Sequence, residues 1–170
     1  MAADPRRDRH RRRRLRRQAV ITQAPAAWLT PAKRQLAERI LHSHQQAFGR
    51  PLAAGAQELF ASDAVVLAHD GDSDPCLIYA NAAALQLWER PWAEMVGMPS
   101  RLTAEAQERP DRARMLASAL EQHAIEGYSG IRISQSGRRF QIHNARLWTL
   151  WGDGGQPCGQ AAAFSSWWWL

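Results

Sequence analysis

Apolar positions follow a helical period after residue 30 and change to short strand-like runs from about residue 59. Thr30 can cap a helix, Pro31 suits its first turn, and Gly49 followed by Pro51 ends it near Phe48. Between these signals the apolar stripe consists of Leu36, Ala37, Ile40, Leu41, Ala47 and Phe48. The pattern predicts a leading helix over about 31–48 and a domain core over about 59–170.

The first strand-like runs are separated by a loop rich in turn residues. Ala64–Ala68 and Cys76–Ala80 predict two strands, with His69–Pro75 as the loop between them. Asn81 follows directly and is predicted to cap a helix, because its side-chain oxygen can accept an unpaired backbone N–H.

Helical spacing and then strand spacing complete the chain. Helices are predicted over Trp92–Val96 and over Pro110–Glu126, the second with Gly127 as its C-cap. Three strands follow, over Tyr128–Ser134, Arg138–Trp151 and Cys158–Ser166, joined by glycine-containing turns. Two strands, then helices, then a meander predict an α+β domain whose helices cover one face of an antiparallel sheet.

Length and charge divide the chain into one domain and a basic arm. With 170 residues there is room for a single domain and a tail. Nine arginines and two aspartates fall within residues 1–17, whereas 13 of the 22 basic and 14 of the 16 acidic side chains lie beyond them. We therefore expect a disordered arginine-rich arm over 1–27 and a nearly neutral domain over 28–170.

The sequence leaves three interpretations of the arm. These are a nucleic-acid contact that acts by counterion release, a solubilising tail, and the product of an upstream start codon. No aromatic residues lie between its arginines to stack on bases. The candidate nucleic-acid contacts are Arg11, Arg12, Arg13, Arg14, Arg16 and Arg17.

Other composition signals exclude several classes of protein. The longest apolar runs are far shorter than the roughly 18 residues of a membrane span, and we predict no membrane partner. Cys76 and Cys158 lie far apart without metal-ligand spacing, so we predict neither a metal site nor a disulfide framework. A reducing, cytoplasmic location fits this cysteine use.

Several stretches of the chain carry a resemblance to known domains. The run Tyr79-Ala80-Asn81-Ala82-Ala83 is similar to the Y-x-N-x-A motif of PAS domains. More specific are Phe48–Leu52, Leu59-Phe60, Val66–Asp70, Leu87–Glu89, Pro99–Leu102, Gly137–Phe140 and Gly159–Ala162. Together these stretches resemble the MEKHLA domain family, and the resemblance implies a PAS-like fold. The resemblance covers about residues 28–170. It implies a five-stranded antiparallel sheet with helices on one face, preceded by the leading helix.

The resemblance also implies a class of function. MEKHLA domains have a suspected sensory or interaction role and bring no enzymatic activity, so we predict a non-catalytic module. PAS-like sheets often pair through the outer face and a leading helix, which makes a homodimer the expected assembly. The alternative is a nucleic-acid-associated protein that binds through the arm and dimerises through the domain.

A sensory domain of this kind would hold its ligand between the inner sheet face and the helices. Strand alternation assigns Val65, Leu67, Leu77, Tyr79, Ile131, Ile133, Phe140 and Ile142 to the core. The ligand-pocket candidates are Tyr79, Trp88, Leu67, Phe140 and Ile142. A core filled by its own side chains is the alternative.

The sequence leaves the cofactor unknown. Arg101–Arg109 has no cysteine for flavin photochemistry, and His123, the candidate haem ligand, is predicted near the end of its helix. His69 with Asp70 is the best candidate for a pH-responsive or polar site, with a structural histidine as the alternative. The terminal Trp167-Trp168-Trp169 either completes the last strand and packs under the leading helix or forms an exposed docking surface.

Overall fold

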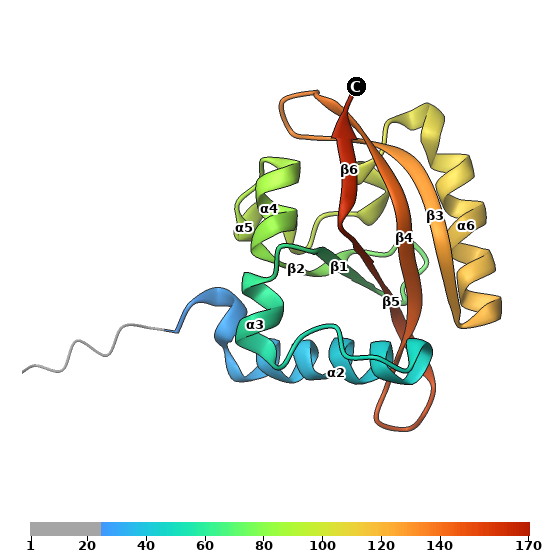
Figure 1. Cartoon of the computed structure of the whole chain (residues 1–170). Helices are drawn as coiled ribbons and strands as arrows, with labels where there is room; N and C mark the ends of the chain where they lie inside the picture. The colour runs from blue at the N-terminus through green and yellow to red at the C-terminus, as the bar shows by residue number, and fades with distance from the viewer. Residues whose placement is uncertain (1–24) are drawn as a thin grey trace, which may run out of the picture.

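The computed structural model describes residues 25–170, and the arginines predicted as nucleic-acid contacts lie outside this range. Figure 1 shows the order of the elements. The helices are η1 (Ala27–Leu29), α2 (Pro31–Phe48), α3 (Ala56–Ala61), α4 (Ala82–Trp88), α5 (Trp92–Met95), η2 (Ser100–Thr103), η3 (Ala106–Glu108) and α6 (Arg109–Gln122). The strands are β1 (Val65–Asp70), β2 (Leu77–Ala80), β3 (Ala124–Ile133), β4 (Arg139–Trp151), β5 (Pro157–Phe164) and β6 (Ser166–Trp169).

Helix α2 begins and ends where the sequence predicts. The hydroxyl of Thr30 accepts the backbone N–H of Lys33 at 3.3 Å, and Pro31 occupies the first turn. Gly49 adopts φ +68° at the C-cap and donates its N–H to the carbonyl of Gln45 at 2.9 Å. A left-handed conformation here favours glycine, which has no Cβ to clash.

The strands form one antiparallel sheet in the order β2-β1-β5-β4-β3. Strand β6 continues along β4 after β5 ends, pairing Phe140–His143 with Ser166–Trp169. The predicted α+β class is therefore confirmed, with the terminal tryptophans forming a short sixth strand.

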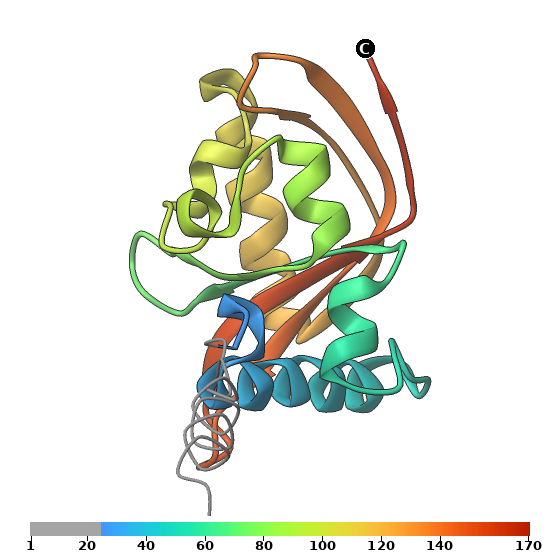
Figure 2. The same ribbon diagram turned by 90° about the vertical axis from the view of Figure 1, so that its left-hand side faces the viewer.

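The helices between β2 and β3 cover one face of this sheet, as predicted, and the leading helix packs with α3 on the other face. Figure 2 shows α4, α5 and α6 on one side of β1, β2 and β5, and α2 with α3 on the other. We call the side of α4 and α6 the inner face and the side of α2 the outer face. On the outer face, Ala37 and Ile40 of α2 are fully buried in a cluster with Trp148 and Leu150. The apolar stripe of α2 is thus satisfied within the chain.

An irregular register explains why strand alternation assigned Tyr79 to the wrong face. Strand β1 pairs Ala68 with Tyr79 and then His69 with Leu77, so Ile78 has no partner in the ladder. Such a bulge shifts the alternation of one strand by one residue. Leu77 consequently lies in the inner cluster, whereas Tyr79 lies in the outer cluster, edge-on to Trp92 at 5.8 Å between ring centroids.

Strand β3 differs from the prediction for a related reason. Gly130 pairs with Ile142 and Arg132 with Phe140, so these residues share the inner face. Ile131 and Ile133 are only half-buried, since their register with Gln141 and Arg139 places them on the outer face. The apolar character of the two isoleucines therefore predicted the wrong side of the strand.

The terminal strand packs against the inner cluster and not under α2. Trp167 and Trp169 lie edge-on to Phe140, with ring centroids 6.2 and 5.6 Å from it. Trp28 instead stacks on Phe60 at 4.1 Å. Between residues 25 and 170 no helix is both long and apolar enough to cross a bilayer.

Candidate ligand-binding site

A cavity of about 60 Å³ lies between the inner sheet face and the helices. Its walls come from all of the strands β1 to β5, from α4 and α6, and from the chain around Thr103. Most of the lining is apolar, including Leu67, Leu77 and Ile142. Drug-sized ligand pockets typically occupy roughly 300–1,000 Å³. In this conformation the cavity suits a small molecule and is too small for a flavin or a haem.

A buried arginine from β3 borders this apolar space. Arg132 is 6% exposed, and its guanidinium donates from Nη1 to the carbonyl of Ile131 at 2.7 Å and from Nη2 to the hydroxyl of Tyr128. The guanidinium also lies over the Tyr128 ring, 5.4 Å from its centroid. No carboxylate within residues 25–170 lies within 4 Å of it. A buried charge without a counter-ion is costly and needs compensation.

A second arginine reaches the cavity from α6. The pKa of Arg112 is lowered to about 10, mainly by burial and in addition by the nearby positive charge of Arg132. Arg112 is therefore still charged near neutral pH. Its side chain makes no hydrogen bond with the described residues, in contrast to Arg132.

His69, which lines the cavity, has an unsatisfied ring nitrogen. Its Nδ1 lies 2.7 Å from the carbonyl oxygen of Asp70, which can only accept, so Nδ1 carries the proton. The other nitrogen, Nε2, is buried and has no partner. Burial is the main cause that lowers the pKa of His69, so the ring is neutral near pH 7 and Nε2 is an acceptor.

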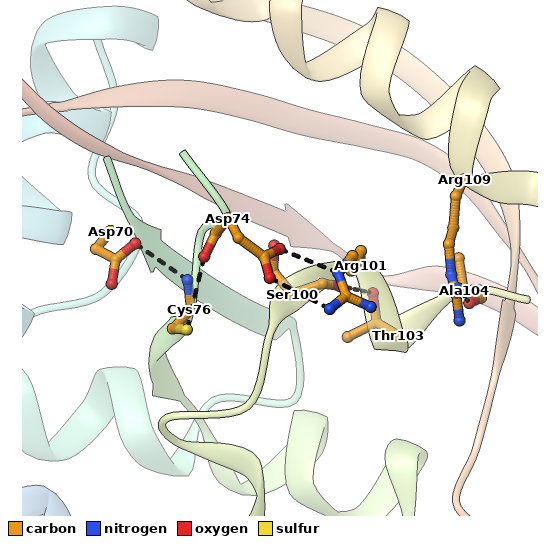
Figure 3. A network of polar contacts seen from close by, with 8 residues as sticks. All are labelled: Asp70, Asp74, Cys76, Ser100, Arg101, Thr103, Ala104 and Arg109. Atoms are coloured by element: carbon orange, nitrogen blue, oxygen red, sulfur yellow. Dashed lines mark hydrogen bonds and ion pairs between the residues drawn. The ribbon is translucent and has the colours of Figure 1, made fainter. Parts of the chain in front are cut away.

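Asp70 has a structural role in the loop beside the site. Its carboxylate accepts the backbone N–H of Cys76 at 3.0 Å and of Asp72 at 3.2 Å, and Figure 3 shows the first of these bonds. His69 and Asp70 are therefore adjacent in sequence, but their side chains have separate roles. The histidine lines the cavity, and the aspartate shapes the β1–β2 loop.

The segment over the cavity is tied to that loop. Arg101 donates to both carboxylate oxygens of Asp74, at 3.0 and 3.2 Å, and Thr103 donates to the carbonyl of Ser100 at 2.8 Å (Figure 3). Thr103 lines the cavity, and its carbonyl accepts the indole N–H of Trp88 at 3.4 Å. These contacts fix the cavity wall without using its unpartnered groups.

The sequence-predicted pocket residues divide between the two sheet faces. Leu67, Trp88 and Ile142 line the cavity. Phe140 lies in the same inner cluster, edge-on to Trp88 at 5.0 Å, outside the lining. Tyr79 lies on the outer face and does not reach the cavity.

The remaining candidates lie away from the cavity. Asn81 is the predicted helix cap, accepting the backbone N–H of Ala84 at 3.1 Å. His123 is exposed at the C-cap of α6 and packs against Trp151. The two cysteines are unpaired and outside the lining, and no cluster of metal-ligating side chains occurs in the described part of the chain.

Sequence reasoning missed the charged and polar lining residues Arg112, Tyr128, Arg132 and Gln160. In the sequence pattern Arg112 occupies an exposed helix position. Arg132 lies between two isoleucines that strand alternation assigned to the core. The only local signal was Gly127 near the start of β3, where the ladder register shifts between Ile125 and Tyr128. A bulge at that point resets which side chains face inward.

Comparisons with known proteins agree on the family and the fold. The MEKHLA domain model matches residues 34–169. No curated protein sequence matches the chain significantly.

Three solved structures show the fold. The PAS domain of a protein from Colwellia psychrerythraea has a TM-score of 0.57 and 16% identity, covering 64% of this chain and 89% of that one. A light-oxygen-voltage domain studied with a flavin analogue has a TM-score of 0.54 and 14% identity, covering 68% and 83%. The light-oxygen-voltage domain of a blue-light-activated histidine kinase from Erythrobacter litoralis has a TM-score of 0.50 and 18% identity, covering 62% and 94%.

Proposed function

The chain belongs to the MEKHLA domain family, and from this premise we propose that it is a PAS-like sensory or interaction module that binds a small ligand in its internal cavity. The observation that carries the proposal is an apolar cavity bordered by polar groups without partners, above all Nε2 of His69. Buried polar groups normally find partners, so a ligand that supplies them would stabilise the folded chain.

The proposed module acts by binding and not by catalysis. Ligand binding would change the packing of α6 against the sheet, because α6 contributes Arg112, Met115 and Leu116 to the cavity. The side-chain amide of Gln160 donates to the carbonyl of Leu116 at 2.9 Å and joins α6 to β5. A ligand competing for this amide would alter that link, which offers a route from the cavity to the surface. We place the module in the cytoplasm, where its cysteines would stay reduced.

The test is native mass spectrometry of the full chain purified from cells, together with its ultraviolet–visible spectrum. We expect a mass above that of the bare chain, with the difference lost on denaturation. Ala162→Met should abolish the added mass by filling the cavity, whereas Ala113→Met on the exposed side of α6 should retain it. A bare mass for the unmodified chain in every preparation would contradict ligand binding.

We propose a homodimer as the working assembly, on the strength of the family resemblance. The surface that PAS-like sheets use for pairing is covered here by α2, so a dimer would be formed through the exposed side of α2 or through the strand edge at β6. Sedimentation equilibrium of the full chain at several concentrations measures this directly. A monomer mass at all concentrations would contradict it.

The charge of the arm favours a second candidate function, nucleic-acid association. Nine arginines in the first 17 residues would neutralise phosphates and release counterions. The full chain should then bind RNA or DNA with an affinity that falls steeply with salt, and deletion of residues 1–17 should abolish that binding. Binding that survives the deletion would locate the contact elsewhere.

A further inference from the structure

We propose that the ligand of the cavity is a small organic carboxylate that carries a hydroxyl group, its carboxylate bound by Arg112 and Arg132 and its hydroxyl donating to His69. This inference rests on the proposed ligand-binding function and names the chemical class of the ligand. Four features of the cavity carry it.

The first feature is paired positive charge without a counter-ion. Arg112 and Arg132 both line the cavity, and no carboxylate of residues 25–170 lies within 4 Å of either guanidinium. The two positive charges repel each other, and this repulsion adds to burial in lowering the pKa of Arg112. An anion between them would relieve this repulsion and restore paired hydrogen bonds, for which the guanidinium fork is well suited.

The second feature is the fixed position of Arg132. Its bonds to Ile131 and Tyr128 hold the guanidinium across Gly130, where a Cβ would lie 2.6 Å from the Tyr128 hydroxyl and 3.1 Å from Nη1 of Arg132. Only glycine leaves room for this arrangement. A guanidinium held in place before binding loses less rotational freedom when an anion arrives.

The third feature is the acceptor on His69. With its proton on Nδ1, the buried Nε2 can accept but not donate. A carboxylate alone leaves this nitrogen unsatisfied, whereas a hydroxyl can donate to it. Arg112 and His69 both line the cavity, so the two side chains border the same space.

The fourth feature is size and apolarity. A volume of about 60 Å³ admits only a short carbon chain, and the walls formed by Leu67, Leu147 and Ile142 suit an alkyl group. Lactate has the three required parts, namely a carboxylate, a hydroxyl and a methyl group. Lactate is therefore a suitable probe, and two near-isosteres, lactamide and propionate, each lack one of its polar parts.

The test is isothermal titration of the full chain, stripped of bound molecules by unfolding and refolding, with lactate, lactamide, propionate and inorganic phosphate. We expect lactate to bind, and lactamide and propionate to bind at least about tenfold more weakly because each leaves a buried polar group unpaired. Equal binding of lactamide would overturn the role of the arginines. Equal binding of propionate would overturn the role of His69, and equal binding of phosphate would show a general anion site.

Variants locate the contacts. Arg112→Met should weaken lactate binding at least about tenfold, whereas the matched Arg114→Met on the exposed side of α6 should leave it unchanged. Gly130→Ala should weaken it by displacing Arg132, and circular dichroism would show whether this variant remains folded. Unchanged lactate affinity in Arg112→Met overturns the inference, whatever affinity Gly130→Ala shows.

The inference and the proposed function fail in different ways. If native mass spectrometry finds a bound uncharged molecule and lactate does not bind, the ligand-binding function stands and the inference is wrong. If no small molecule is bound in any preparation and no probe binds, both are wrong.

Discussion

At the scale of single residues, Asn81 connects more backbone than a helix cap requires. Its amide group donates to the carbonyls of Ala64 at 2.7 Å and of Leu59 and Ser62 at 3.3 Å. Its oxygen accepts the N–H of Val66 at 2.9 Å as well as that of Ala84. One fully buried side chain thus joins the end of α3, the start of β1 and the start of α4.

Asn81→Ala should therefore destabilise the fold severely. Several buried backbone groups would lose their partners, at roughly 1–3 kcal/mol each, and we expect a loss of about 3 kcal/mol or more in the free energy of unfolding. Chemical denaturation of the variant measures this, with exposed Gln86→Ala on the same helix as the control. A loss below about 1 kcal/mol would show that the network contributes little.

His44 makes stability depend on pH. It is fully buried on α2, its Nδ1 lies 3.0 Å from the carbonyl of Arg50, and its ring is edge-on to Trp148. Burial is the largest cause that lowers its pKa to about 4, and the charge of Arg146 adds to this. The unfolded chain therefore binds a proton more readily than the folded chain between about pH 6.5 and 4.

The resulting contribution to stability is complete above about pH 6.5 and is lost as the pH falls toward 4. In His44→Phe we expect the free energy of unfolding to fall by about 2 kcal/mol less over this pH range than in the unmodified chain. Urea denaturation at several pH values measures the difference. His42→Phe is the control, because His42 is exposed on the same helix. An identical pH profile for His44→Phe and the unmodified chain would rule out His44 as the source.

At the scale of elements, the terminal strand has one packed side and one exposed side. Trp169 packs edge-on against Phe140, and the guanidinium of Arg138 lies 3.7 Å from its ring centroid. Trp168, the neighbour in sequence, is 48% exposed. Alternation along β6 therefore separates two identical side chains by environment.

Trp169→Ala should lower the free energy of unfolding by about 2–3 kcal/mol, because a half-buried aromatic side chain and its cation–π contact are lost. Trp168→Ala should change it by less than about 0.5 kcal/mol. Thermal unfolding of the two variants tests the assignment, and similar losses for both would contradict the orientation of β6.

Element boundaries also show what the sequence could and could not predict. Local signals located α2 and the cap of α4 because capping depends on neighbouring residues. The helix predicted to run to Glu126 instead ends at Gln122, with His123 at φ +65°, because Ala124 and Ile125 pair with Trp148 and Leu147 on β4. Gly127, predicted as the helix cap, lies within the resulting register shift. Long-range pairing decided this boundary, and no local pattern reveals it.

The same limit applies to the site. Trp88, Leu67 and Ile142 were predictable as inward-facing apolar residues. Arg112 and Arg132 were not, since their meeting depends on how α6 packs on β3 and on two irregularities of the ladder. Tyr79 was misplaced by the unpaired Ile78 on β2.

At the scale of the whole molecule, the sheet separates two cores with different roles. The outer core, between the sheet and α2, is filled by apolar and aromatic side chains. The inner core leaves a cavity with two arginines, a tyrosine and a histidine on its walls. Helix α2 can therefore support the sheet while the inner side remains available to a ligand.

Methyl spectroscopy of the methionines tests ligand binding in the cavity most directly. Met115 lines the cavity, whereas Met95 is fully buried outside the lining. In the stripped full chain, labelled at its methionine methyl groups and assigned with Met115→Leu, we expect the low-molecular-weight fraction of a cell extract to shift the Met115 signal and leave that of Met95 in place. A spectrum in which the Met115 signal does not move would contradict a ligand in this cavity.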